Sequence, residues 1–388
     1  MSVVAIGVPD TWHPTPGTWN LTPVLWPSMA LALTPRLLRR GLELFALISL
    51  VGVVVVLLVY GDNLQAVVAP LLHLRWRWLL VGLGLASMDW VGGGARLWVV
   101  ARHVHPGVRV RDMIVSGGMS AWGAYLTPFQ SGAGPMMMYT MKRAGVSLPE
   151  AMTSTFMTFV ATVAFFAIAG PVAIYFGAGK SLAQHKVALG VTYYALFRAS
   201  LTIFGILGIV MIVMMVFPRA IRDVVQWAAT RLSGRSRRIS GRLEQLRVGI
   251  DRAHECLVAF ASPRGWLALF WAVVLSGPSH ANKLLAGYVT LRVLNIPANF
   301  VDILLLQTFI TFLLYFAPTP GSAGLAEFLS ATVMHIYVGP SLLPTYTLIW
   351  RFINSYATVG FGSFVFWRWL RRGLIGLEES VTAPSATP

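Results

Sequence analysis

The chain has 388 residues, of which 56% are hydrophobic and 11% are charged, and its mean hydropathy is +0.69. Soluble domains average about 25% charged residues, so this composition excludes an ordinary soluble protein and indicates a chain whose solvent is mostly lipid. The net charge of +16 fits basic cytoplasmic loops better than a nucleic-acid surface, and we expect no nucleic-acid partner. The single cysteine, Cys256, excludes an internal disulfide and a cysteine-rich metal site.

Three segments are expected along the chain. Residues 1–36 form a flexible N-terminal tail, because Met1–Pro35 holds six prolines and lacks the basic segment and apolar run of a signal peptide. Residues 37–372 form one transmembrane domain, and residues 373–388 form a C-terminal tail.

Six apolar stretches are long enough to cross about 30 Å of hydrocarbon as helices. They are Gly41–Tyr60, Trp78–Val100, Glu150–Phe176, Gly190–Phe217, Arg264–Leu291 and Leu343–Trp369. The sequence therefore predicts an all-α polytopic membrane protein with about six full transmembrane helices.

Two further apolar stretches, Asp112–Met141 and Asp302–Val338, are interrupted near their middle by proline and glycine. Proline removes a backbone donor, and each half is too short to span the membrane alone. Each stretch is therefore predicted to form a re-entrant hairpin rather than a kinked spanning helix. The residues expected to form the breaks and to line cavities are Pro128, Gly132, Gly134, Pro318, Pro320, Gly321 and Gly324.

The distribution of Lys and Arg favours the hairpins. With the N-terminus inside and both hairpins returning to the side they enter from, 21 basic residues face the cytoplasm, five face outside and four lie within spans. The positive-inside rule predicts this excess. We therefore expect both termini in the cytoplasm, the loop around Gly61 outside, and a location in a bacterial-type inner membrane.

An internal repeat gives a second argument for the hairpins. A shift of 190 residues places Asp112 on Asp302, Tyr125 on Tyr315, Pro128 on Pro318, Ala133 on Ala323 and Gly134 on Gly324, without a gap. Three spans lie between the two interrupted stretches, so the second unit, about 264–369, is expected to be inverted relative to the first, about 78–176. Transporters use such repeats to hold a substrate near the midplane.

A basic segment, 219–264, lies between the two units and contains ten Lys and Arg residues. Apolar residues recur in it at helical spacing from Ile239 to Ala253. This pattern predicts an amphipathic helix on the cytoplasmic surface, with anionic lipid as its partner.

Charged side chains within spans are costly and often mark functional pathways. Asp89 and Arg96 are seven residues apart, on one face of a continuous helix, and are predicted to form a structural ion pair. Lys283 and Arg351 have no acidic neighbour in sequence, so we expect them to face an anionic headgroup, with Glu327 as one counter-charge. The full set of expected substrate-binding residues is Lys283, Arg351, Glu327, His280, Asn282, Asn354 and Arg198. For each, the alternative is a structural pair or a snorkelling side chain.

No nucleotide, metal or catalytic motif is found. The chain lacks a G-x-x-x-x-G-K-[ST] phosphate loop and an H-E-x-x-H zinc motif. The run Gly92-Gly93-Gly94 is expected to allow close helix packing. We therefore expect no cofactor, no metal and no catalytic residue, and a protein that is not an enzyme.

The second break carries a family resemblance. Residues 318–327, PTPGSAGLAE, resemble the Pro-Thr-Pro-Gly-Gly-x-Gly-x-x-Glu motif of the flippase-like transmembrane region of lysylphosphatidylglycerol synthases and their stand-alone relatives. The first break, with the Gly145-Val146-Ser147 that follows it, is similar to a looser motif of that family. The resemblance covers about 37–372 and implies a flippase-like fold, a motif position at Glu327, and phosphatidylglycerol derivatives or other membrane lipids as substrates, without the soluble synthetase domain.

The chain departs from the family at residues 131–139, SGAGPMMMY, where the usual Gly-Glu and Arg are missing. This charge-free break makes a weakly polar lipid, such as a hopanoid, the alternative to an anionic substrate.

Together these observations predict a transporter that moves a phosphatidylglycerol-type or other anionic lipid between leaflets through a midplane cavity. We expect methionine at Lys283 or Arg351 to slow lipid movement without preventing folding, and Asp89→Asn to lower stability. A membrane-embedded lipid-modifying enzyme and a transporter of a small solute are alternatives from other classes. The first lacks a compact catalytic set, and the apolar stretches Met136–Met138 and Phe309–Phe316 argue against the second. The oligomeric state stays open, with a homodimer among the options.

Overall fold

The computed structural model describes residues 35–60, 69–176 and 258–382, with scattered residues between 195 and 227. The expected N-terminal tail, the span Gly190–Phe217, the basic segment 219–264 and the last residues of the C-terminal tail lie wholly or mostly outside the described residues. The described elements are all helical, with no strand among them, which confirms the predicted all-α class.

The first half of the described chain consists of α2 (Pro35–Tyr60), a short 3₁₀ helix (Ala69–His73), α4 (Trp76–Ala86), a 3₁₀ turn (Ser87–Asp89), α5 (Val91–Val104), α6 (Val110–Tyr125), a 3₁₀ turn (Pro128–Gln130), α7 (Ala133–Arg143) and α8 (Leu148–Tyr175). The second half consists of α12 (Pro263–Ser279), α13 (Ala281–Val293), α14 (Phe300–Tyr315), a 3₁₀ turn (Pro320–Ser322), α15 (Leu325–Met334), a 3₁₀ turn (Pro340–Leu342), α16 (Leu343–Arg351), a π-helical turn (Phe352–Tyr356) and α17 (Ala357–Thr382).

Two of the predicted spans are continuous helices. Leu38–Tyr60 in α2 and Leu148–Val172 in α8 are each long and apolar enough to cross a membrane. Pro171 lies within α8, close to its end, where a missing backbone donor interrupts little of the helix.

Three other predicted spans are interrupted, which corrects the expectation of continuous helices. The span Trp78–Val100 breaks at the 3₁₀ turn between α4 and α5. The span Arg264–Leu291 breaks at His280, two residues after Pro278. The span Leu343–Trp369 contains the π-helical turn between α16 and α17. Proline explains the second interruption, and π turns occur frequently at functional positions.

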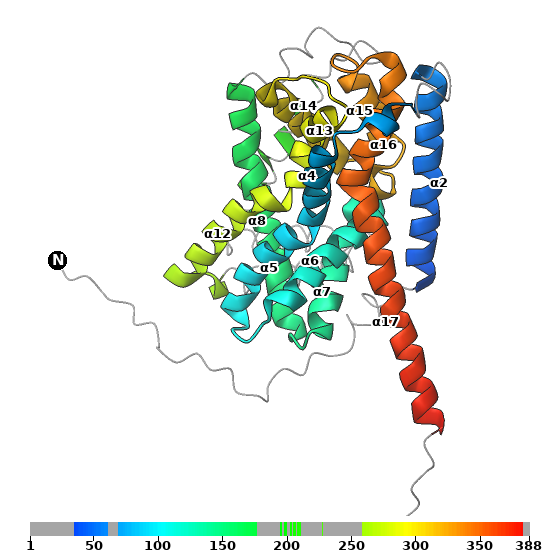
Figure 1. Ribbon diagram of the computed structural model, residues 1–388. Coiled ribbons are helices and arrows are strands. Elements are labelled where there is room, and N and C mark those ends of the chain that lie inside the picture. Colours follow the sequence, from blue (N-terminus) through cyan, green and yellow to red (C-terminus); the bar gives the residue numbers. More distant parts are fainter. Residues whose placement is uncertain are drawn as a thin grey trace, which may run out of the picture.

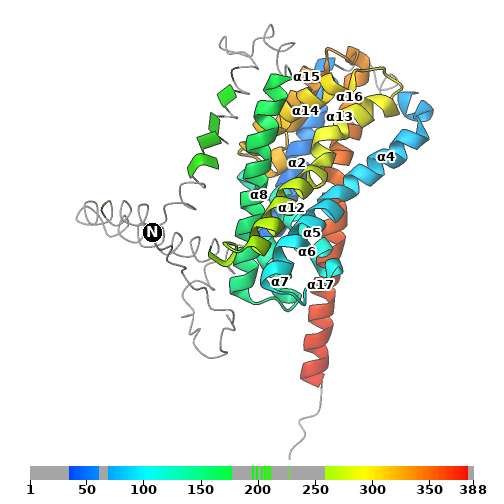
Figure 2. The same cartoon turned by 90° about the vertical axis from the view of Figure 1, so that its left-hand side faces the viewer.

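Two short helical hairpins occupy opposite ends of the molecule. Helices α6 and α7 lie in its lower half, whereas α14 and α15 lie in its upper half, and both views agree on this arrangement (Figures 1 and 2). The breaks at the tips of the hairpins meet between these halves, where the Phe129 backbone N–H donates to the Ala317 carbonyl at 3.2 Å. The two breaks are therefore in direct contact.

The two halves contain corresponding elements at a nearly constant offset. Helices α6 and α14 each have 16 residues and start and end 190 positions apart. After these helices the offset changes to 192, because the turn Pro128–Gln130 corresponds to Pro320–Ser322. The gapless alignment of Pro128 with Pro318 was therefore wrong: two extra residues follow α14, and the structural counterpart of Pro128 is Pro320.

The glycine run in α5 brings three helices into backbone contact. A Cβ atom on Gly94 would lie 2.3 Å from the Cα of Ile114 in α6, and one on Gly92 would lie 2.8 Å from the carbonyl carbon of Pro278 in α12. No side chain fits at such distances, so the prediction of close helix packing is confirmed. This packing fixes α5 between the first hairpin and the broken span α12–α13.

Candidate functional site

The backbone at both breaks adopts the same unusual turn. Phe129 and Gln130 have φ values of 52° and 55°, and Gly321 and Ser322 both have φ of 56°. Left-handed backbone is uncommon for residues other than glycine and marks positions that the surrounding structure holds in place. At Gly321 the space is also closed, since a Cβ atom would lie 2.6 Å from the Phe45 ring.

One buried ion pair lies beside the second break. The Arg351 Nε donates to the Glu327 carboxylate at 2.9 Å, and the two side chains are 2% and 0% exposed. Glu327 also accepts hydrogen bonds from the Ser49 hydroxyl at 2.5 Å, the Tyr356 hydroxyl at 3.2 Å and the Gly324 backbone N–H at 2.8 Å. The carboxylate thus connects α2, the start of α15 and the end of α16.

A second ion pair joins the two halves of the chain. The Lys283 Nζ donates to the Asp89 carboxylate at 3.1 Å. The other Asp89 oxygen accepts from the hydroxyls of Tyr125 at 3.0 Å and Thr358 at 2.9 Å. Side chains of three helices, α6, α13 and α17, therefore converge on one buried carboxylate.

The predicted pair of Asp89 with Arg96 is wrong. Asp89 lies in the 3₁₀ turn between α4 and α5, so the face of a continuous helix that would have joined it to Arg96 does not exist. Arg96 donates instead through Nη1 to the hydroxyls of Thr162 at 2.7 Å and Ser276 at 3.3 Å.

Arg351 pairs with Glu327, the counter-charge named from the sequence, whereas Lys283 pairs with Asp89, which was not expected. Each already pairs with a carboxylate of the described chain, so neither requires a lipid phosphate as counter-charge. Removal of one partner of a buried pair leaves the other charge uncompensated. The expectation that methionine at these positions spares folding is therefore withdrawn.

Three predicted polar residues surround the second pair. The Asn354 carbonyl, within the π-helical turn, accepts from the Tyr125 hydroxyl at 2.7 Å and from the Asn282 amide at 3.2 Å. A π turn displaces carbonyls from the regular i→i−4 pattern, which makes them available to side chains. His280 is buried at the break of α12–α13, where its Nδ1 lies 2.7 Å from the Ser276 carbonyl.

A small polar chamber of about 20 Å³ lies where these groups meet. It is lined by Tyr125, Gln130, Lys283, Thr311, Leu314, Tyr315, Gly321, Ser322, Arg351 and Asn354. Its volume is enough for about one water molecule. Both breaks and both buried cations contribute to its wall, so the chamber is the point at which the two hairpins and the two ion pairs are connected.

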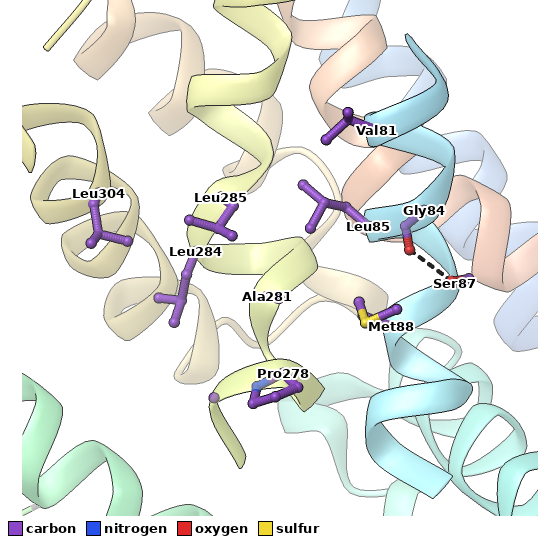
Figure 3. Close-up of a pocket in the computed structure, with 11 residues that line it drawn as sticks. Val81, Gly84, Leu85, Ser87, Met88, Pro278, Ala281, Leu284, Leu285 and Leu304 are labelled. Atoms are coloured by element: carbon purple, nitrogen blue, oxygen red, sulfur yellow. Dashed lines mark hydrogen bonds between the residues drawn. The ribbon is translucent and has the colours of Figure 1, made fainter. Parts of the chain in front are cut away.

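An open apolar groove of about 660 Å³ lies beside the interrupted spans (Figure 3). Its lining residues are Val81, Gly84, Leu85, Ser87, Met88, Gly277, Pro278, Ala281, Leu284, Leu285 and Leu304. The polar Ser87 hydroxyl donates to the Gly84 carbonyl at 2.7 Å and so offers the groove no free donor (Figure 3). Met88 in the groove wall is adjacent in sequence to Asp89 of the ion pair, so apolar and polar surfaces lie on the two sides of one turn.

The structure brings together most, but not all, of the predicted substrate-binding residues. Lys283, Arg351 and Asn354 line the chamber, while Glu327, Asn282 and His280 are buried in contact with its walls or nearby. Arg198 has an exposed side chain, unlike the other members of the set. Of the predicted break residues, Gly321 lines the chamber, and Pro128 and Pro318 are exposed.

Sequence reasoning missed four hydroxyl groups of the site: Ser49, Tyr125, Tyr356 and Thr358. Ser49 was detectable as a polar residue within the apolar span Gly41–Tyr60. Tyr125 was noted for its place in the repeat, but its hydroxyl had no assigned partner. No group of three or more metal-ligating side chains occurs among the described residues.

The described helices define an α-helical membrane protein, with two helices long enough to cross a bilayer and three other predicted spans interrupted. The chain belongs to the family described as the lysylphosphatidylglycerol synthase TM region, whose model matches residues 44–362. This match confirms the resemblance seen at the second break. No curated protein and no solved structure matches the chain significantly.

Proposed function

We propose that this protein moves a membrane lipid between the two leaflets. The observation that carries the proposal is the meeting of two hairpin tips, from opposite ends of the molecule, at a chamber whose wall includes Lys283 and Arg351, the cations of two ion pairs. The description of the family, which concerns a membrane-lipid synthase, supports a lipid as the substrate. In this proposal the hairpins are re-entrant and the two halves form an inverted repeat, as in many transporters.

The apolar groove and the polar chamber supply the two environments that a lipid needs. Acyl chains would lie against the groove, whose lining is mostly apolar, while the headgroup would pass the chamber. A volume of about 20 Å³ is too small for any headgroup, so the structure corresponds to a closed arrangement. Transport then requires the tips to separate, first on one side and then on the other.

The orientation follows from the basic residues. Helix α2 begins and α17 ends at the end of the molecule that carries α7, whose last turn contains Lys142 and Arg143 (Figure 1). We place this end in the cytoplasm of a bacterial-type inner membrane, with both termini inside.

A weakly polar lipid is the second candidate substrate, and one specific observation favours it. Lys283 and Arg351 are both neutralised by carboxylates of the chain, which leaves neither as an obvious ligand for an anionic headgroup. The charge-free sequence of the first break points in the same direction.

The proposal can be tested by locking the tips together. Segments joined by a backbone hydrogen bond have Cα atoms about 5 Å apart, which suits a disulfide, so Phe129→Cys and Ala317→Cys are combined in a Cys256→Ser background. The protein is reconstituted into vesicles with fluorescent phosphatidylglycerol or a fluorescent uncharged lipid, and inner-leaflet label is measured by its protection from an impermeant quencher.

The reduced double-cysteine protein should move one of these lipids faster than protein-free vesicles do, and oxidation should reduce the rate by at least about tenfold. The single-cysteine variants, treated in the same way, are the controls and should be unaffected. Equal rates for the oxidised and reduced pair would contradict the proposal, and the lipid that moves decides between the two substrates.

A further inference from the structure

The two buried carboxylates of the site meet different kinds of donor. Both oxygens of Glu327 face N–H groups, because Oε1 accepts from the Arg351 Nε and Oε2 accepts from the Gly324 backbone N–H. An N–H group of this kind cannot accept a hydrogen bond. A proton on either oxygen would therefore point at another donor, so the partners of Glu327 suit only the charged carboxylate.

Asp89 has one oxygen with a different environment. Its Oδ1 faces the Lys283 ammonium, a group that only donates. The partners of Oδ2 among the described residues are the hydroxyls of Tyr125 and Thr358. A hydroxyl can donate or accept a hydrogen bond, so Oδ2 is a position at which the carboxyl group can carry a proton.

The Tyr125 hydroxyl has a single proton and lies between two acceptors. Its oxygen is 2.7 Å from the Asn354 carbonyl and 3.0 Å from the Asp89 Oδ2. When Asp89 is charged, Tyr125 donates to it, and the Asn354 carbonyl keeps the hydrogen bond from the Asn282 amide at 3.2 Å. When Asp89 carries a proton on Oδ2, it donates to Tyr125, and Tyr125 donates to Asn354. The same atomic positions therefore satisfy both protonation states of Asp89.

Tyr125 and Lys283 connect this carboxylate with the polar chamber, because both line its wall. The chamber volume of about 20 Å³ is enough for about one water molecule. A proton from that water passes to the Tyr125 oxygen while the proton of Tyr125 passes to the Asp89 Oδ2. Uptake removes the counter-charge of Lys283, whose ammonium is hydrated once the tips separate and admit more water.

Other ionisable groups near Asp89 come from several elements. Besides its hydrogen-bonded partners, Arg96 of α5 and Tyr315 of α14 interact with it electrostatically. His280, at the break between α12 and α13, interacts with Lys283. Asp89 is the single carboxylate among these groups of the described chain, so a proton taken up from the chamber has one anionic site to neutralise.

We propose that Asp89 is the binding site of a proton whose passage across the membrane is coupled to the movement of the lipid. The proton comes from a hydronium ion on the side to which the chamber is open, neutralises Asp89, and returns to water on the other side. One hydronium ion is thus consumed and one is formed, and a transmembrane proton gradient supplies the energy. This inference rests on the proposed function, because it names the source of energy for the same site.

The distribution of fluorescent lipid between the leaflets tests the coupling. The full-length protein is reconstituted into vesicles with a difference of about one pH unit across the membrane, and the membrane potential is held at zero. The label in each leaflet is measured with the impermeant quencher after movement has ceased. Transport of one proton for each lipid should change the leaflet ratio by up to about tenfold, because one pH unit is a tenfold ratio of proton activity. A protonophore should abolish this change.

The variant Tyr125→Phe removes the hydroxyl between the chamber and Asp89 but keeps both charges of the ion pair. Asp89 retains the hydrogen bond from Thr358, so the variant should fold. It should still move lipid but lose the effect of the pH gradient on the leaflet ratio. The matched control is Tyr356→Phe, which removes a hydroxyl from Glu327 and should keep the full effect. A merely structural Tyr125 would alter the rate of movement and leave the ratio under the gradient unchanged.

Movement of lipid by the wild type with the same leaflet ratio in the presence and absence of the gradient would overturn the inference and leave the proposed function intact. If no lipid moves, infrared spectroscopy of the purified protein decides whether the proton site exists, because a protonated carboxyl group has a carbonyl stretch that a carboxylate lacks. Lowering the pH should produce a band that is missing when Asp89→Asn is combined with Lys283→Met. The presence of this band would support the proton site without the proposed function, and its absence would overturn the site as well.

Discussion

The pair of Glu327 with Arg351 permits a quantitative prediction. Arg351→Met would leave the Glu327 carboxylate 0% exposed and surrounded by neutral donors, of which Ser49 and Tyr356 are two. Loss of one partner from a buried pair costs about 3–5 kcal/mol, and an unpaired charge in the bilayer centre costs about 2.5–3.5 kcal/mol on insertion scales. We therefore expect Arg351→Met to lower the free energy of unfolding by about 3–4 kcal/mol.

A double-mutant cycle isolates this effect. Combining Arg351→Met with Glu327→Gln removes both charges, so the double variant should lose only the net value of neutral hydrogen bonds, about 1–2 kcal/mol. Unfolding is measured in detergent with a thiol-independent probe, with Arg109→Met as control. Arg109 is 79% exposed and pairs with Asp112 at the surface, where an ion pair contributes about 0–1 kcal/mol. A double variant no more stable than Arg351→Met alone would refute the reasoning.

Two further predictions concern the second pair and the topology. Asp89→Asn should lower stability by about 3 kcal/mol because it strands the Lys283 ammonium, and Lys283→Met on that background should restore most of the loss; additive losses in unfolding experiments would contradict the pairing. In a cysteine-free background, a cysteine in place of Asp62 should react with an impermeant reagent in intact cells, and a cysteine in place of Arg235 should not. The reverse pattern would invert the proposed orientation.

Local sequence patterns were sufficient to predict the two breaks. Residues such as Pro128 and Gly321 interrupt apolar stretches that are too short to span when divided, and this argument needs no knowledge of distant contacts. The bounds of α6 and α14 also agree with the 190-residue shift, and Asp112 and Asp302 occupy the same position in the first turn of the two helices. The gapless alignment missed the two extra residues before Pro320, because Ala323 and Gly324 are by chance identical to Ala133 and Gly134.

The partners of the charged residues were not predictable in this way. The Asp89–Arg96 pair was inferred from helical spacing, which assumes that the helix continues from residue 89 to residue 96. No proline lies between residues 78 and 100 to indicate that the chain turns at Ser87–Asp89, so nothing in the local sequence contradicted the assumption. Lys283 is 194 positions from Asp89, and only the tertiary packing of α13 against the turn brings the two together.

The interruptions that sequence reasoning missed are those that the proposed mechanism requires. In a continuous α4–α5 helix, the regular helical period would fix the directions of the Met88 and Asp89 side chains. The turn instead allows Asp89 to face Lys283 while Met88 faces the groove. The break of the second half at His280 places Lys283 and Leu284 on opposite sides in the same manner. Both of these interrupted spans thus present one apolar and one charged residue, adjacent in sequence, to two different environments. An amphipathic lipid needs the same two environments side by side, which is why we assign the movement of lipid to these interrupted spans together with the hairpin tips.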